Sequence, residues 1–231
     1  MAFGFKAVGD NGETIIDGEL PGLNLVYSTV WTSPSLGYGA EPPNAEAGDV
    51  YMTYITAVPA QFLSDQHVFV VRCLTAYVAA YRVWNPFGTG LQLQMYVHPT
   101  APSFSTSTHD VEIYVFKSQV AAEGDFGLKV FSSAGTLMFS SEDKPLRVVS
   151  GEVEADEDFT IPSGVGKAAV FAVCLNSLNG GDYGDGYIYA PMTMKVTATS
   201  VKSSKMLHLG SPWPGVYMVV DVSNCPIPFS V

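Results

Sequence analysis

The side chains best able to carry out chemistry in this sequence are histidines, cysteines and carboxylates. The four histidines are dispersed along the chain, at His67, His98, His109 and His208. The three cysteines are also far apart, at Cys73, Cys174 and Cys225. None of these groups has the spacing of zinc ligands, and an odd, dispersed set of cysteines is not a disulfide framework. We therefore predict no metal site here, and we interpret Cys73 and Cys174, which lie in apolar runs, as core residues.

A dense acidic run consists of Glu152, Glu154, Asp156, Glu157 and Asp158. Every second position from 152 to 158 is acidic, which would place four carboxylates on one face of a strand. Such a face can be a solvated sheet edge that blocks unwanted strand pairing, or it can be a calcium site. The segment 179–186 also carries two aspartates among glycines, but it lacks the pattern of a calcium loop, so we interpret it as a turn.

Aromatic side chains form a third group, because exposed tyrosine and tryptophan platforms bind sugars and protein partners. Tyr183, Tyr187 and Tyr189 have even spacing, so they can line one face of a strand. Trp213 lies between two prolines, which predicts a turn. These four residues are our candidate partner contacts. The alternative is that they belong to the core or to a subunit interface.

Motifs for catalysis and cofactor binding are missing from the sequence. It has no nucleophile elbow, no phosphate-binding glycine loop and no zinc-protease helix motif. Hydrolysis of a polysaccharide would need a pair of carboxylates, and no pair stands out. We therefore predict that the protein is not an enzyme and has no catalytic residue, no cofactor and no metal.

The charge balance excludes two kinds of partner. The chain has 11 basic and 22 acidic residues, a net charge of −11. Nucleic-acid binding needs clustered lysine and arginine, and the sequence has no such cluster. The same sign disfavours an anionic membrane surface, and no apolar run approaches the roughly 18 residues of a membrane span. No signal peptide is recognisable, so we expect a soluble chain made in a cytoplasm.

Composition predicts an all-β protein. Only 14% of the residues are charged, whereas 12% are aromatic, and the chain has 22 glycines and 15 prolines. This composition favours short strands joined by tight turns over disorder, coiled coils or long amphipathic helices. The low total of charges also suggests that part of the surface is held against other subunits. The length of 231 residues fits one large domain or two small ones.

An internal repeat relates residues 3–26 to residues 126–149, at an offset of 123 residues. Seven of the 24 aligned pairs are identical, and they are Phe3/Phe126, Gly4/Gly127, Lys6/Lys129, Gly12/Gly135, Glu19/Glu142, Leu23/Leu146 and Val26/Val149. Both copies have the pattern of a β-hairpin, with turns at Asn11-Gly12 and at Ala134-Gly135. The repeat indicates either duplication of a unit or one sheet built from two matching hairpins.

Strand patterns continue along the rest of the chain. We predict one or two strands over 68–84, and further strands over 91–97, 111–117, 167–175, 186–189, 192–198, 206–209 and 216–222. Turn clusters at 176–186, 200–204 and 210–215 separate the later strands, and 32–49 and 98–107 are predicted loops that can act as contact arms. The pattern predicts an antiparallel, β-sandwich-like fold in two parts, residues 1–123 and 124–231.

The second copy of the repeat also carries a recognisable motif. Its sequence from Gly127 to Ser141 fits the form Gly-Leu-x-Val-Phe-x-x-x-Gly-x-x-x-Phe-x-Ser, and Arg147-Val148-Val149 follows. Together with the start Met-Ala-Phe-Gly-Phe-Lys, this block resembles a hairpin that recurs in small structural proteins of tailed bacteriophages. Those proteins are minor tail, tail-tip or fibre-associated components. The resemblance brings no catalytic residues.

The resemblance implies a non-enzymatic structural protein of a tailed-phage virion, assembled in the bacterial host cytoplasm. We expect it to join other phage tail proteins at the tail tip or baseplate, as a homo-oligomer or ring that packs through β-rich surfaces. One alternative is a receptor-binding tail module that recognises a host surface sugar or pilus through the loops at 32–49, 98–107 or 176–190. Another is a capsid or head-decoration protein.

Overall fold

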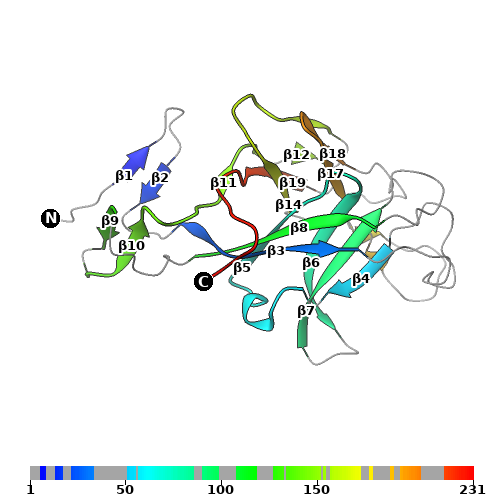
Figure 1. Ribbon diagram of the computed structural model, residues 1–231, viewed down its shortest axis with the longest axis horizontal. Helices are drawn as coiled ribbons and strands as arrows, with labels where there is room; N and C mark the ends of the chain where they lie inside the picture. Colours follow the sequence, from blue (N-terminus) through cyan, green and yellow to red (C-terminus); the bar gives the residue numbers. More distant parts are fainter. Residues whose placement is uncertain are drawn as a thin grey trace.

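The computed structural model describes residues 6–8, 14–17, 22–33, 51–55, 57–85, 90–98, 108–118, 127–132, 134–151, 153–154, 157–172, 177–178, 188–189, 193–203 and 216–231. Their regular structure is strands with antiparallel pairing and one short 3-10 helix, η1 (Ala60–Phe62) (Figure 1). The predicted all-β antiparallel fold is therefore confirmed. Within these residues, no helix has the length and apolar character needed to cross a membrane.

Eight strands form the larger of two main sheets, which we call the large sheet. Its order is β11 (Arg147–Val148), β19 (Val216–Asp221), β14 (Ala168–Ala172), β5 (His67–Arg72), β8 (Asp110–Ser118), β3 (Leu23–Thr32) and β20 (Phe229–Ser230), and β12 (Val153–Glu154) also pairs with β19. Its central strands are apolar on both faces, as strands buried on both sides must be. In β8, for example, Ile113 and Tyr114 point to opposite faces and both are fully buried.

Six strands form the second main sheet, which we call the small sheet. Its order is β13 (Phe159–Thr160), β18 (Ser200–Ser203), β17 (Met194–Val196), β6 (Tyr77–Asn85), β7 (Gly90–His98) and β4 (Tyr51–Ile55). Three two-stranded sheets complete the fold. They are β1 (Lys6–Val8) with β2 (Thr14–Asp17), β9 (Lys129–Phe131) with β10 (Leu137–Ser140), and β15 (Ser177–Leu178) with β16 (Ile188–Tyr189).

Strand connectivity relates most of the described strands as two copies of one unit. In the first unit, β3 to β8, strand β8 pairs with β3 and β5, and β7 pairs with β4 and β6. In the second unit, β11 to β14 and β17 to β19, strand β19 pairs with β11, β12 and β14, and β18 pairs with β13 and β17. If β11 and β12 are taken as one interrupted strand, the two units have the same connectivity, apart from the β15–β16 pair between β14 and β17.

The two units meet through equivalent strands. β5 pairs with β14 at Val71 and Val170 in the large sheet, and β6 pairs with β17 at Val78 and Met194 in the small sheet. Both pairings are antiparallel. Equivalent strands that meet antiparallel are related by a two-fold rotation, so the molecule has internal two-fold pseudosymmetry. Duplication, one of the two interpretations of the sequence repeat, is therefore supported well beyond the repeated residues.

Each unit is preceded by one of the two predicted hairpins. β1–β2 pairs Lys6 with Asp17 and Val8 with Thr14, and residues 123 positions later in β9–β10 pair in the same way. The register shift falls at the same place in both hairpins. The alternative of one sheet built from the two hairpins is wrong, because they belong to separate two-stranded sheets. Asn11 and Gly12, the predicted first turn, lie outside the described residues.

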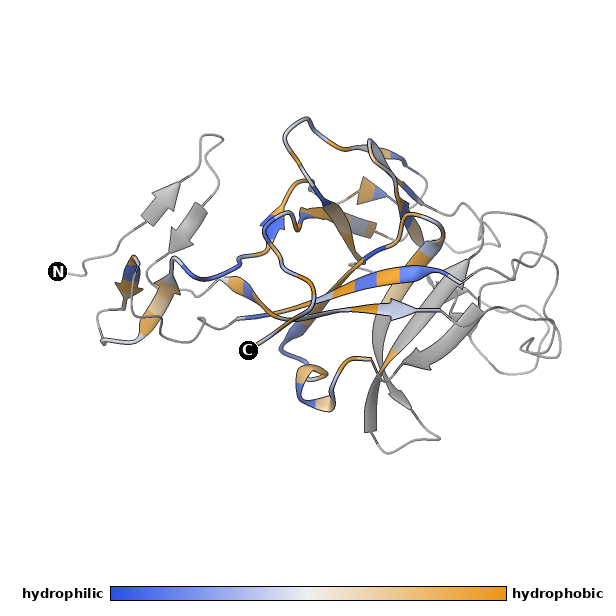
Figure 2. Ribbon diagram, in the orientation of Figure 1, coloured by the Kyte–Doolittle hydropathy of each residue, from blue (hydrophilic) through white to orange (hydrophobic). Residues whose placement is uncertain are grey.

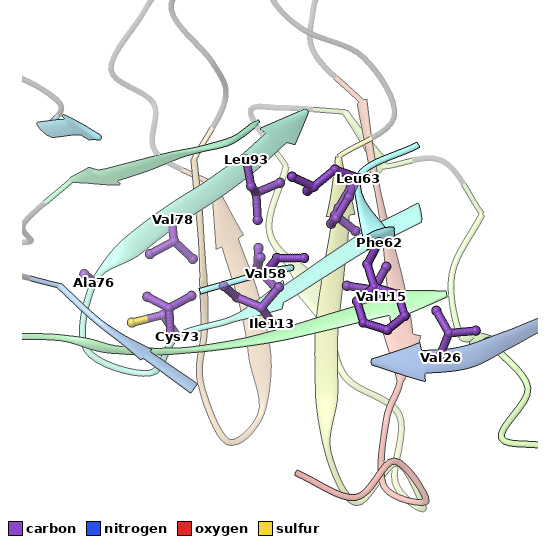
Figure 3. Close-up of a cluster of buried hydrophobic side chains, with 13 residues drawn as sticks. Val26, Val58, Phe62, Leu63, Cys73, Ala76, Val78, Leu93, Ile113 and Val115 are labelled. Carbon is purple, nitrogen blue, oxygen red and sulfur yellow. The ribbon is translucent and has the colours of Figure 1, made fainter. Parts of the chain in front are cut away.

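Three apolar cores follow from this arrangement. One lies between the large-sheet and small-sheet strands of the first unit and includes Ile113, Leu93 and Phe62 (Figure 3). A second lies between the corresponding strands of the second unit and includes Tyr217 and Met194. The third lies on the opposite face of the large sheet, where both units contribute and the C-terminal segment covers them. Burial of these residues supplies the main stabilisation of the fold.

The large sheet curls back on itself over the third core. The segment before β11 bonds to the first residues of β3, although these strands lie far apart in the sheet order. The Leu25 amide donates to the Lys144 carbonyl at 2.9 Å, and the Leu146 amide donates to the Leu23 carbonyl at 2.7 Å. Leu23 and Leu146 are equivalent residues of the sequence repeat, so the two units also meet here as a two-fold pair.

Three details of the predicted strand map are wrong. Residues 200–203 form β18 instead of a turn, because the chain reverses earlier, where the Thr197 amide donates to the Ser200 carbonyl. Residues 177–178 form β15 inside a predicted turn. The acidic run does not lie on one strand: β12 ends at Glu154, and the chain then turns from the large sheet to β13 of the small sheet.

The other predicted strands are confirmed where the structure describes them, and residues 173–175, 186–187 and 192 of these predictions lie outside the described residues. Residues 68–84 form two strands, β5 and β6, and β6 continues into β7 as a hairpin. The predicted strand 206–209 lies outside the described residues. Both main sheets contain strands from both parts of the chain. The division into residues 1–123 and 124–231 stays a prediction, since its boundary lies outside the described residues.

Candidate interaction surface

Polar side chains fix the shape of the β9–β10 hairpin, which is the second copy of the repeated element. Ser141 closes its open end: its amide donates to the Leu128 carbonyl at 2.8 Å, and its hydroxyl accepts from the Leu128 amide at 3.1 Å. At the exit, the Asp143 carboxylate accepts from the Ser140 amide at 2.8 Å. These bonds satisfy backbone groups that a two-stranded sheet leaves free at its ends.

Glycines are required at two positions of this hairpin. Gly135, in the predicted turn with Ala134, has φ +80°, in the left-handed region that favours glycine. Gly127 has φ +122°, and a Cβ there would collide with the Ser141 hydroxyl. Both glycines are identical in the first copy of the repeat. The geometry therefore explains why the repeat retains them.

Two apolar side chains of the hairpin are exposed in the part of the chain that the structure describes. Leu128 is 56% exposed and Phe131 is 52% exposed. Figure 2 shows hydrophobic residues on both of its strands, and Figure 1 shows this hairpin and the β1–β2 hairpin toward the same end of the long axis. A two-stranded hairpin has little stability by itself, so these two residues are a candidate contact surface. We call Leu128, Phe131 and their hairpin the hairpin surface.

A second notable site is a group of charges where the two units meet. Glu112 of β8 forms ion pairs with Arg72 of β5 at 3.3 Å and with Lys167, which precedes β14, at 2.9 Å. The Tyr114 hydroxyl donates to the same carboxylate at 2.8 Å, and the Lys167 ammonium lies 5.5 Å from the centre of the Tyr114 ring. The carboxylate thus joins a strand pair of the first unit to the second unit.

Electrostatics agree with a fixed, ionised Glu112. Burial opposes ionisation, but hydrogen bonds from Lys167 and Tyr114 and the charges of Arg72 and Lys167 outweigh it, so the pKa of Glu112 is lowered. Burial and the Glu112 acceptor together raise the pKa of Tyr114 far above its usual range. The Arg72 Nε atom is buried and has no hydrogen-bond partner among the described residues. We interpret this group as an electrostatic link that stabilises the contact between the two units, and we call it the lock between the units.

His109 forms a third polar group, at the start of β8. Its Nδ1 atom lies 2.9 Å from the Thr75 hydroxyl, and its amide donates to the Ser33 hydroxyl at 2.9 Å. The side chain is buried, and its Nε2 atom has no partner among the described residues. Burial lowers the pKa of His109, and the charge of Lys195 lowers it further, so the imidazole is neutral at pH 7.

Two further groups have strongly shifted pKa values, and both belong to the core. Burial, followed by the charge of Asp158, raises the pKa of Tyr217 to about 12. Its hydroxyl donates to the Glu157 carbonyl at 2.8 Å, which ties the acidic run to β19. Burial, followed by the charge of Asp221, raises the pKa of the Cys225 thiol to about 11. Cys73 and Cys225 are buried and free, and Cys174 lies outside the described residues.

The aromatic residues predicted as partner contacts are not assembled in the described part of the chain. Tyr183, Tyr187 and Trp213 lie outside it. Tyr189 is in β16, where only its backbone is described. Among the described residues no three histidine, cysteine or acidic side chains form a possible metal site.

The charge group around Glu112 was missed by sequence reasoning. Arg72 and Lys167 are 95 positions apart in the chain, and only the β5–β14 pairing brings them to one carboxylate. The two arginines in the apolar segment 68–84, Arg72 and Arg82, were the sign available in the sequence. Comparisons with protein-family models, curated proteins and solved structures gave no match.

Proposed function

We propose that this protein is a non-enzymatic structural component of a tailed-bacteriophage virion, at the tail tip or baseplate or associated with a fibre. The observation that carries the proposal is the repeated hairpin. Its second copy carries the motif that resembles a hairpin of tailed-phage structural proteins. Its polar residues and glycines hold a fixed shape, and its apolar residues Leu128 and Phe131 remain exposed. A rigid element with uncovered apolar side chains serves subunit packing.

The duplicated architecture supports the same role. The two units share both main sheets and the third core, and the ion pairs of Glu112 join them. Sheets that are continuous across both units make a stiff body from which two equivalent hairpins extend at one end (Figure 1). A stiff body with paired contact elements suits a protein that acts by holding its neighbours in position.

Purified particles of the virus that encodes this chain provide the test. The proposal expects the protein to be present in them by mass spectrometry, and antibody-labelled electron micrographs to place it on the tail. Labelling on the head would favour a capsid or head-decoration protein. Absence from purified particles would refute the structural role.

A further inference from the structure

We propose that the buried imidazole of His109 is an acid-sensitive switch, and that its protonation releases the start of β8 from the end of β3 and from the β5–β6 connection (residues 73–76). The inference goes beyond the proposed function and does not depend on it. It starts from the burial of a titratable group, because His109 is only 6% exposed. We call His109 and its two hydrogen-bonded neighbours, Ser33 and Thr75, the His109 joint.

Three segments of the chain meet at the His109 joint. The His109 amide donates to the Ser33 hydroxyl at 2.9 Å, and the His109 carbonyl accepts from the Ser33 amide at 2.8 Å, so this backbone holds the residue that follows β3. The ring holds the β5–β6 connection through the Thr75 hydroxyl, 2.9 Å from Nδ1. The Cys73 carbonyl of this connection also accepts from the Val196 amide of the second unit at 3.0 Å. The joint therefore connects β3, β8 and a segment that contacts the second unit.

The hydrogen bonds of the ring fit its neutral form. A neutral imidazole has one N–H donor and one acceptor nitrogen, whereas an imidazolium has two donors. At Nδ1 the Thr75 hydroxyl can serve as donor or acceptor, but the buried Nε2 atom has no hydrogen-bond partner among the described residues. Protonation therefore leaves a charged N–H donor at Nε2 without an acceptor in the described part of the chain. A buried charge in that situation is costly, so the proton favours a state in which the ring reaches water.

The charged groups around the joint do not compensate an imidazolium. Burial lowers the pKa of His109, and the charge of Lys195 on β17 lowers it further. The neighbouring Asp110 carboxylate accepts from the Thr32 hydroxyl of β3 at 2.6 Å, and no described carboxylate is hydrogen-bonded to the His109 ring. The remaining titratable or charged residues of the adjoining segments are Cys73, Tyr77 and the ion-paired Arg72 and Glu112.

Acid therefore favours the open form of the joint. In the open form the ring returns to its ordinary pKa of 6.5, so this form binds a proton that the closed form excludes. The equilibrium constant for opening consequently increases as the pH falls below 6.5, by as much as about tenfold per pH unit, until the closed form is protonated as well. Above pH 6.5 the ring is neutral in both forms, and the constant does not change. The switch thus operates in mildly acidic solution.

Native-state hydrogen exchange of the full chain, from about pH 7.5 to about pH 5.5, tests the inference. The probe is the Ser33 amide, whose acceptor is the His109 carbonyl. Each exchange rate is divided by the intrinsic rate at the same pH, which gives the equilibrium constant for opening. We expect this constant to increase by as much as about tenfold over the range. The Ile161 amide, which donates to the Thr199 carbonyl in the second unit at 2.9 Å, is the internal control and should show a smaller increase.

Two histidine variants assign the effect to His109. The His109→Gln side chain can still form a hydrogen bond with Thr75 but does not titrate, so its opening constant at Ser33 should be the same at both ends of the pH range. His67→Gln is the matched control, because His67 is also buried and its Nδ1 atom lies 2.8 Å from the Ser64 hydroxyl. This control should retain the full increase of the wild-type protein. Circular dichroism of each variant verifies that it is folded.

Several outcomes would overturn the switch. They are an opening constant at Ser33 that does not change with pH, an increase that persists in His109→Gln, and an equal increase at Ile161, which would show global unfolding. If His109→Gln does not fold, an NMR titration of the His109 ring in the wild-type protein decides. A ring that becomes protonated while the Ser33 amide keeps its full protection overturns the proposal, and a ring that stays neutral while this protection falls supports it. The presence of the protein in virus particles is a separate measurement, so the proposed function stands or fails independently.

Discussion

Replacing Glu112 with glutamine removes the negative charge that pairs with Arg72 of the first unit and Lys167 of the second. Glu112 accepts from Tyr114 and forms ion pairs with Arg72 and Lys167, and its side chain is 19% exposed. Glutamine has nearly the same shape, so the change isolates the charge from the packing. The two cations then face a neutral amide in a largely buried position.

The expected loss lies between two limits. Removing one partner of a buried ion pair costs about 3–5 kcal/mol, whereas an exposed pair contributes about 1 kcal/mol at most. The ion pairs of Glu112 are partly screened by water, and the amide oxygen retains one acceptor for Tyr114. We therefore expect the free energy of unfolding to fall by about 2 kcal/mol. For a chain of this length, that lowers the Tm by about 4–8 °C.

The pH dependence gives a second, independent measurement. The pKa of Glu112 is lowered in the folded protein from its ordinary value of 4.5. Its contribution to stability is therefore complete above pH 4.5 and is lost as the pH falls through the lower, folded-state pKa. The difference in stability between wild type and Glu112→Gln should be constant at neutral pH and should shrink in acid.

Urea unfolding followed by tryptophan fluorescence, repeated from neutral to acid pH, measures both quantities. Asp110→Asn is the matched control, because it makes the same acid-to-amide change at the exposed start of the same strand. It should alter stability by less than about 0.5 kcal/mol. If Glu112→Gln is no more destabilising than Asp110→Asn, or if its effect persists unchanged in acid, the assignment of Glu112 as a lock between the units is refuted.

Three further predictions concern the hairpin and the cores. Gly127→Ala should lower the free energy of opening the β9–β10 hairpin by about 1–2 kcal/mol, because alanine is strained at this φ. Faster hydrogen exchange of the Ser141 amide would show this change. Gly22→Ala is the control, because Gly22 has open space around it. Ile113→Ala should destabilise the protein by about 2–5 kcal/mol in urea, since the side chain is fully buried, and a smaller loss would contradict its place in the first core. The Cys225 thiol, with a pKa of about 11, should resist a thiol reagent at pH 8 until the protein unfolds, and rapid labelling of the native protein would contradict its burial.

Fold class was predictable because it depends on local pattern. Alternating apolar residues and glycine-rich turns specify antiparallel strands wherever they occur. The repeat was predictable for the same reason, since glycine at Gly135 allows a turn conformation that few other residues adopt. The strand predictions were wrong where hydrogen bonding, and not local composition, determined the backbone conformation. The serine-rich segment 200–203 is a strand because Val201 is buried and because Thr197 and Ser200 close the turn before it.

The amino-acid sequence by itself determined that this is an antiparallel all-β protein with a repeated hairpin, because turn and strand preferences act over a few residues. Only the tertiary structure decided that the duplication extends to the strands of both main sheets. Beyond the hairpins, the two units are recognisable from strand order and pairing, while strands such as β5 and β14 have different residues. Many apolar side chains can fill the same buried position, so connectivity is retained after the sequence has changed. The charge group around Glu112 likewise exists only because the fold joins distant segments.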